Sequence, residues 1–236
     1  MAGVVGVIPA RLGATRFPNK PLVDIFGEPM LLAVYRRAAA VLDRVILAVD
    51  GPELAALGRS VGAEVVLTDP ALPSGSDRVA AALDQLGDWP EHVINVQGDL
   101  PLLPAAHLEA LVARAGEAPV ITLRCPLVGD PHDPARVKVV TDDLGRALYF
   151  SRSPVPSGGP WHEHIGLYLY TASALRGFVA ASPSALERSE RLEQLRLMSL
   201  GVPILVADVA TGSPSIDLPA DLDRLRRAGP PPRGSG

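Results

Sequence analysis

The chain opens with MAGVVGVIPARLGATRFPNKPL (residues 1–22), in which an apolar run passes directly into a loop with three cations. Residues 4–8 carry no polar side chain, which is typical of a strand buried on both faces of a parallel sheet. The cations Arg11, Arg16 and Lys20 follow, among prolines and a glycine that shape the backbone. Such a loop, at the carboxyl end of a first strand, is where an α/β sheet binds a polyanion. A solvated basic loop is the alternative.

The composition bounds the class of protein. Of the 236 residues, 47% are hydrophobic and 20% are charged, which predicts a sizeable core and argues against wholesale disorder. The formal net charge of −4 argues against a nucleic-acid partner. The single cysteine, Cys125, excludes an internal disulfide and a cysteine-based zinc site, and its apolar neighbours predict a buried, inert thiol.

The amino-terminal sequence also bears on localisation. A core strand at the start leaves no room for a signal peptide, and no apolar stretch is long enough to cross a bilayer. We therefore expect a cytoplasmic protein with no membrane partner.

Strand-like and helix-like patterns alternate through the first half of the chain. Strands are expected at 4–8, 44–49, 63–67 and 92–96, and helices at 29–42, at 53–61 and from the residues after Arg78 to Leu86. This alternation predicts an α/β fold with a doubly wound, mostly parallel sheet.

The second half is less regular. We expect helices at 105–114, 186–200 and 219–228, strands at 120–125, 164–170 and 203–207, and a small β-hairpin extension at 136–150. The segment 164–170 could rejoin the main sheet. With no interdomain linker, residues 1–228 are expected to form one domain, and the Gly- and Pro-rich residues 229–236 a disordered tail.

Two aspartates are candidates for a metal site. Asp99 follows the predicted strand 92–96, on the same rim as the cationic loop, and Asp217 lies just before the last helix. Two carboxylates are about what Mg²⁺ takes from a protein when phosphate oxygens and water complete its shell. The alternatives are an ordinary turn residue for Asp99 and a helix cap, together with Pro219, for Asp217.

Several motifs, in order along nearly the whole chain, resemble those of the 3-deoxy-manno-octulosonate (Kdo) cytidylyltransferase family. They are Ile8-Pro9-Ala10-Arg11, Thr15-Arg16, Lys20-Pro21-Leu22, Ser74-Gly75-Ser76-Asp77-Arg78, Asn95-Val96-Gln97-Gly98-Asp99, Val137-Lys138-Val139-Val140, Tyr149-Phe150-Ser151-Arg152, His164-Ile165-Gly166-Leu167-Tyr168, Leu192-Glu193-Gln194 and Ile216-Asp217. The resemblance implies a Rossmann-like nucleotidyltransferase fold and transfer of CMP from CTP to the anomeric hydroxyl of a keto-sugar acid, with release of pyrophosphate.

The resemblance also assigns roles to residues. Arg11, Arg16 and Lys20 would hold the triphosphate and stabilise the departing pyrophosphate, and Asp99 and Asp217 would hold Mg²⁺. The cytidine pocket would be lined by Pro9, Ala10, Ser74, Arg78 and Gln97. The acceptor would be received by Arg152, His164, Tyr168, Glu193 and Gln194. Tyr168 could instead be a core residue, and His164 a hydrogen-bonding residue without a catalytic role.

The sequence departs from the family pattern at three places. Ala14 stands where a serine is usual, Leu100 stands where a glutamate is usual, and only eleven residues separate Arg152 from His164. These departures leave two alternatives open: a cytidylyltransferase acting on a different acid, such as a phosphonate, and a catalytically idle nucleotide-binding module. The family is usually dimeric, and we expect the hairpin at 136–150 to pair across the two-fold axis of a homodimer.

Overall fold

The computed structural model describes residues 3–13 and 17–230. Arg16 and Ala14, and most of the predicted tail, lie outside these residues. The chain forms two compact units: the first comprises residues 1–108 and 213–236, and the second residues 109–212. The expectation that residues 1–228 form one domain stays a prediction.

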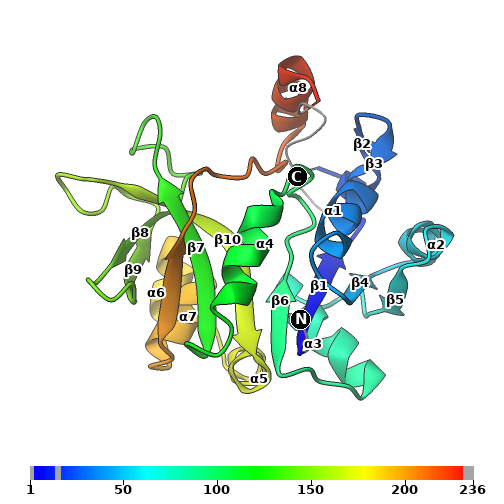
Figure 1. The fold of residues 1–236 in the computed structure, drawn as a ribbon, viewed down its shortest axis with the longest axis horizontal. Helices are drawn as coiled ribbons and strands as arrows, with labels where there is room; N and C mark the ends of the chain where they lie inside the picture. Colours follow the sequence, from blue (N-terminus) through cyan, green and yellow to red (C-terminus); the bar gives the residue numbers. More distant parts are fainter. Residues whose placement is uncertain (1–2, 14–16, 231–236) are drawn as a thin grey trace. The chain divides into compact units, whose positions relative to one another are not determined.

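The first unit is built on a parallel sheet (Figure 1). Its strands are β1 (Val4–Ala10), β4 (Val45–Val49), β5 (Glu64–Leu67) and β6 (His92–Asn95), in the order β6-β1-β4-β5. All three pairings are parallel, with Gly6 opposite Val45 and Val4 opposite His92. Residues Val4–Ile8 of β1 are all buried, as the apolar run predicts. The parallel α/β sheet expected from the sequence is confirmed.

Helices connect the parallel strands. They are α1 (Met30–Ala39), α2 (Pro52–Ser60) and α3 (Gly75–Leu86). Helix α3 begins earlier than predicted, because the Ser74 hydroxyl accepts the N–H of Asp77 and so caps the helix at Gly75. The predicted last helix is α8 (Pro219–Ala228), which contributes Leu222 and Leu225 to a small core with Met30 of α1. Short elements between β1 and α1 are the 3₁₀ helix η1 (Lys20–Leu22), β2 (Asp24–Ile25) and β3 (Glu28–Pro29).

The second unit has a mixed sheet in which β11 (Ile204–Asp208), β7 (Val120–Pro126) and β10 (His162–Thr171) lie in that order. Strand β11 is parallel to β7, and β10 is antiparallel to it. The predicted hairpin is formed by β8 (Lys138–Thr141) and β9 (Ala147–Ser151), and β8 also pairs with β10 (Figure 1). The chain passes from the first unit to the second within α4 (Ala105–Ala113).

The prediction of one helix at 186–200 is wrong. The segment forms α6 (Ala185–Glu190) and α7 (Gln194–Ser199), separated at Arg191, whose φ is 56°. The cause is a set of long-range hydrogen bonds: Arg152 donates through Nε to the Glu190 carbonyl at 2.9 Å and through Nη2 to the Arg191 carbonyl at 3.3 Å. These two carbonyls accept hydrogen bonds from Arg152, where in a continuing helix they would accept backbone N–H groups.

Helix α5 (Ala172–Ala180) is an addition to the elements predicted from the sequence. The Thr171 hydroxyl caps it by accepting the N–H of Ala174. Across the part of the chain that the structure describes, no helix combines the length and the apolar character that crossing a membrane requires.

Candidate active site

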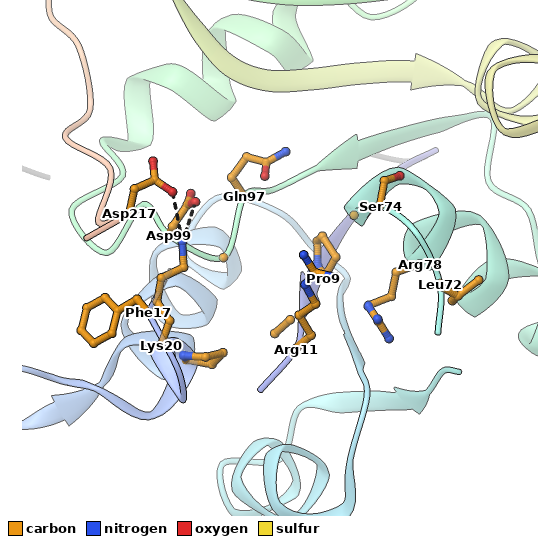
Figure 2. Close-up of a pocket in the computed structure, with 14 residues that line it drawn as sticks. Pro9, Arg11, Phe17, Lys20, Leu72, Ser74, Arg78, Gln97, Asp99 and Asp217 are labelled. Atoms are coloured by element: carbon orange, nitrogen blue, oxygen red, sulfur yellow. Dashed lines mark hydrogen bonds and ion pairs between the residues drawn. The ribbon is translucent and has the colours of Figure 1, made fainter. Parts of the chain in front are cut away.

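A cavity of about 250 Å³ opens in the first unit, beyond the carboxyl end of β1 (Figure 2). It is lined by Pro9, Ala10, Arg11, Phe17, Lys20, Pro21, Leu72, Ser74, Gly75, Arg78, Gln97, Gly98, Asp99 and Asp217. Every described residue that the sequence assigned to the nucleotide or the metal is among them. Gly98 is needed here because a Cβ at this position would lie 3.0 Å from the Pro9 carbonyl oxygen.

Lys20, Asp99 and Asp217 meet at one end of the cavity (Figure 2). The Lys20 Nζ lies 3.0 Å from Asp99 Oδ2 and 3.5 Å from Asp217 Oδ1. The backbone N–H of Ile216 donates to the Asp99 carbonyl at 2.9 Å, which fixes the carboxy-terminal segment beside the loop after β6. The structure therefore brings together the two predicted metal ligands, which are 118 positions apart (217 − 99).

The electrostatics of this cluster centre on Asp99. Partial burial raises the pKa of Asp99, the Lys20 ammonium lowers it, and the nearby charge of Asp217 raises it further. Because the two carboxylates repel each other and are partly shielded from water, a cation bound between them would be favoured. The N-cap residue of α8 is Leu218, and the Asp221 carboxylate accepts the N–H groups of Asp217 and Leu218 at 3.0 and 2.8 Å.

Arg78 lies toward the opposite end of the cavity from this cluster (Figure 2). Its side chain is only 2% exposed, and its Nη1 donates to Thr68 Oγ1 at 2.5 Å and to the Asp69 carbonyl at 3.2 Å. The Nη2 atom is buried and has no hydrogen-bond partner among the described residues. A buried donor without a partner is costly, so this guanidinium is suited to a polar group of a ligand.

The hydroxyl of Ser74 is already engaged. It accepts the Asp77 N–H at 3.2 Å and donates to Asp77 Oδ2 at 2.5 Å. Ser74 therefore shapes the wall of the cavity by starting α3. Pro9 and Ala10 belong to β1 and bring its backbone to the cavity, while Gln97 reaches it from the loop after β6.

The predicted acceptor residues all belong to the second unit. Arg152 is tied to backbone carbonyls: besides Glu190 and Arg191, its Nη1 donates to the Pro134 carbonyl at 2.8 Å. Glu190 in turn accepts the Ser151 hydroxyl at 2.9 Å and the Arg152 N–H at 3.0 Å. This guanidinium is thus held rigidly and keeps N–H groups beyond those three bonds.

His164 and Tyr168 lie on β10 with their ring centroids 5.4 Å apart. Nε2 of His164 is 2.9 Å from Thr122 Oγ1, and desolvation lowers its pKa to about 3, so the ring is neutral at pH 7. Tyr168 is 8% exposed, and its buried hydroxyl has no hydrogen-bond partner among the described residues. Burial raises the pKa of Tyr168, and the charges of Tyr170 and Glu193 raise it further. Tyr168 is therefore a buried residue, as its core alternative requires, with an unused hydroxyl.

Glu193 and Gln194 lie at the start of α7, where Glu193 is the N-cap residue and Gln194 is 6% exposed. The break at Arg191 places them at the start of a new helix. Of the predicted acceptor residues, His164 and Tyr168 are neighbours on β10, and the charge of Glu193 acts on the pKa of Tyr168.

A family model described as cytidylyltransferase matches residues 5–204. The 3-deoxy-manno-octulosonate cytidylyltransferase of Parvibaculum lavamentivorans is 45% identical to this chain, over 94% of it and 91% of that protein. The protein of the same name from Methylobacterium nodulans is 46% identical, over 93% of this chain and 94% of that protein. The chain belongs to the 3-deoxy-manno-octulosonate cytidylyltransferase family.

Solved structures agree with this family assignment. A structure titled CMP:2-keto-3-deoxy-manno-octonic acid synthetase complexed with CTP superposes with a TM-score of 0.90 at 35% identity, covering 96% of this chain and 98% of that one. A glucose-1-phosphate thymidylyltransferase from Bacillus anthracis superposes with a TM-score of 0.69 at 14% identity, over 95% of this chain and 94% of that one. The second likeness shows the nucleotidyltransferase fold alone.

The structure shows the surroundings of two of the departures from the family pattern, Leu100 and the short segment before His164. Leu100 is 5% exposed, so its side chain belongs to the core and offers no charge to the site. Within the short segment between Arg152 and His164, Trp161 donates through Nε1 to the Pro156 carbonyl at 2.8 Å. The Trp161 carbonyl accepts the N–H of Leu127, just after β7, at 3.0 Å and so ties the segment to the sheet.

Sequence reasoning missed two residues that hydrogen-bond to the backbone next to predicted site residues. Asp50 bonds to the loop after β1, and Lys138, fully buried, donates to the carbonyls of Asp133, Arg136 and Arg152. For Asp50 the signal was available, because it is a carboxylate at the end of a buried strand, as Asp99 is. Lys138 stands within the motif Val137-Lys138-Val139-Val140, but neither this motif nor the charge within an apolar strand indicated that its ammonium group binds backbone carbonyls.

Proposed function

We propose that this chain transfers CMP from CTP to the anomeric hydroxyl of Kdo or a closely related keto-sugar acid and releases pyrophosphate. The observation that carries the proposal is the meeting of Lys20, Asp99 and Asp217 in a cavity that also holds Arg11 and Arg78. Family membership agrees with it.

The nucleotide would bind in the cavity of the first unit. Lys20 and Arg11 supply positive charge for the triphosphate, and Arg16 is proposed to join them. Arg78 offers its unpartnered Nη2 to the base, with Pro9, Ala10, Ser74 and Gln97 completing the pocket. In such a transfer the protein mainly positions the groups and neutralises charge.

Asp99 and Asp217 fit a divalent cation, which we propose to be Mg²⁺. The donor set is two carboxylates, and burial, with a smaller contribution from the charge of Asp217, raises the pKa of Asp99. Mg²⁺ takes one or two carboxylates alongside phosphate oxygens. When bound, the ion supplies Lewis-acid stabilisation of the charge that develops on the α-phosphate. When the nucleotide is absent, the Lys20 ammonium would lie between the two carboxylates and reduce their mutual repulsion.

The acceptor would be received by Arg152, His164, Tyr168, Glu193 and Gln194. The anomeric hydroxyl oxygen attacks the α-phosphorus and its proton passes to solvent. A new P–O bond forms, the bond from the α-phosphorus to the oxygen bridging to the β-phosphate breaks, and pyrophosphate leaves. Arg152 suits a carboxylate because its guanidinium is held in place by three carbonyls. His164, being neutral, can offer a hydrogen bond but no positive charge.

A different acid is the second candidate acceptor. The observations that favour it are the buried Leu100 at a family glutamate position and the compact Gly- and Pro-rich segment around Trp161. An idle nucleotide-binding module is disfavoured, because such a module has no need for Lys20 between two carboxylates. We also propose a homodimer that pairs through the hairpin of β8 and β9.

Pyrophosphate release tests these possibilities together. The purified chain is assayed with each of the four NTPs, with Mg²⁺, against a panel of acids that includes Kdo and phosphonates, with Asp99→Asn as the inactive control. Release with CTP and Kdo is the expected result. Release with CTP and another acid alone supports the second candidate, and no release with any pair contradicts cytidylyl transfer.

A further inference from the structure

Asp50 follows β4 directly and touches the loop that leaves β1. Its Oδ1 and Oδ2 both accept the backbone N–H of Leu12, at 3.2 and 3.1 Å, across 38 positions of sequence. Leu12 follows Arg11, which lines the cavity. This bond therefore ties the cationic end of β1 to the end of the neighbouring strand.

Asp50 also acts on Arg78 at the cavity wall. Burial lowers the pKa of Arg78, the charge of Asp50 is the largest effect that opposes this, and the charge of Arg11 lowers the pKa further. Arg11 and Arg78 therefore repel each other, while Asp50 attracts Arg78 and holds the backbone next to Arg11. At Arg78, Asp50 thus opposes the effect of Arg11, together with a smaller contribution from Asp69, although Asp50 does not line the cavity.

We propose that Asp50 is a positioning residue for the nucleotide: it fixes the backbone at Arg11 and Leu12 and holds Arg11 and Arg78 together before CTP arrives. The inference rests on the proposed cytidylyl transfer. It gives Asp50 no contact with the substrate and no part in the transfer step. Its loss should therefore weaken nucleotide binding and leave the rate at saturation nearly unchanged, because preorganisation lowers the cost of binding.

Two variants separate the charge of Asp50 from its hydrogen bond. Asp50→Asn keeps an oxygen that can accept the Leu12 N–H but removes the charge, whereas Asp50→Ala removes both. The matched control is Asp24→Asn, because the Asp24 carboxylate also accepts a backbone N–H, that of Gly27 at 3.1 Å, in a turn that does not line the cavity. Each protein is titrated with CTP by calorimetry in the presence of Mg²⁺ and no acceptor. The kcat, both KM values and the Tm are then measured.

We expect Asp50→Asn to raise the Kd and KM for CTP about threefold to tenfold. Asp50→Ala should raise them more than about tenfold, equivalent to more than about 1.4 kcal/mol. The kcat and the KM for the acceptor should stay within about twofold of wild type in both Asp50 variants, and Asp24→Asn should match wild type throughout.

An unchanged Kd for CTP in Asp50→Asn overturns the charge role, and it does so even where Asp50→Ala fails to fold. Parallel losses of kcat, acceptor affinity and Tm also overturn the proposal, because a general folding defect would produce them. A wild-type chain that binds CTP but releases no pyrophosphate with any acid contradicts the proposed function, while the calorimetric comparison still decides the role of Asp50. A wild-type chain that binds no CTP overturns both.

Discussion

The ammonium group of Lys20 lies 3.0 Å from the carboxylate of Asp99, although 79 positions separate them in the sequence. Both side chains are mostly shielded from water, with exposed fractions of 17% and 23%. The Lys20 ammonium opposes the rise that burial causes in the pKa of Asp99. In the absence of nucleotide, Lys20 therefore supplies the positive charge that Asp99 and Asp217 require.

Replacing Lys20 should slow the reaction. We expect Lys20→Ala to lower kcat/KM by more than about tenfold, or about 1.4 kcal/mol of barrier. The reason is that the variant loses a cation facing the phosphates and leaves Asp99 and Asp217 to repel each other. Steady-state pyrophosphate release measures this effect. Arg36→Ala, which removes an exposed partner of Glu28, is the control, and a Lys20→Ala rate equal to that control would refute the role.

Asp99→Asn should abolish turnover and at the same time stabilise the fold. The pKa of Asp99 is raised in the folded chain, so ionised Asp99 lowers stability above its unfolded pKa and the penalty grows as pH rises. A neutral amide avoids that penalty. Thermal unfolding at pH 7 should therefore give a higher Tm for the variant, and turnover close to that of wild type would remove the metal role.

His164 should make stability depend on pH in a defined window. Its pKa is about 3 in the folded chain and about 6.5 in the unfolded chain, so unfolding takes up a proton between these values. The contribution of neutral His164 to the free energy of unfolding is complete above pH 6.5 and is lost as the pH falls toward 3. We expect the loss of Tm between pH 7 and pH 5 to be smaller in His164→Gln than in wild type. Equal losses would contradict the low pKa.

Arg152→Lys should impair acceptor binding selectively. A lysine cannot reach the carbonyls of Pro134, Glu190 and Arg191 at once, so the cation loses its fixed position. We expect the KM for the acceptor to rise more than about tenfold while the KM for CTP changes less than about twofold. Initial-rate kinetics with each substrate varied in turn would show the split, and equal changes in both KM values would argue against it.

The pair of Glu187 and Arg196 should be important for stability. Arg196 donates to both Glu187 oxygens, at 2.8 and 2.6 Å, its side chain is 9% exposed, and its guanidinium lies 4.3 Å from the Phe178 ring centroid. Glu187→Ala leaves that charge buried, so we expect a loss of about 3 kcal/mol in the free energy of unfolding.

Urea unfolding measures this loss. Asp208→Ala removes the exposed carboxylate that Arg124 contacts at 2.7 Å and should cost less than about 1 kcal/mol. Similar losses in the two variants would contradict the importance of burial.

The sequence indicates those parts of the fold that depend on local pattern. The run Val4–Ile8 predicts the central strand because a strand buried on both faces carries only apolar side chains. The cavity follows from that strand, since loops at the carboxyl ends of parallel strands gather at one edge.

Features that depend on distant partners were beyond local pattern. The break at Arg191 is caused by Arg152, and the bond from Leu12 to Asp50 joins two loops. Locally, the residues around Arg191 fit a continuous helix, and Asp50 is recognisable as a carboxylate at the end of a strand but not as the acceptor of the Leu12 N–H. The ion pairs of Lys20 belong to the same class, because no local signal shows that Lys20 lies between the two predicted metal ligands.

The first unit is discontinuous in sequence, since it is interrupted after Leu108 and resumes at Ser213. Residues 1–212 contain every strand of that unit's parallel sheet, but they do not contain Asp217. The acidic pair therefore forms only when the segment after residue 212 packs back against the loop after β6, where the Ile216 N–H donates to the Asp99 carbonyl. A truncation before Asp217 would remove one carboxylate of the pair while leaving every strand of the parallel sheet in the chain.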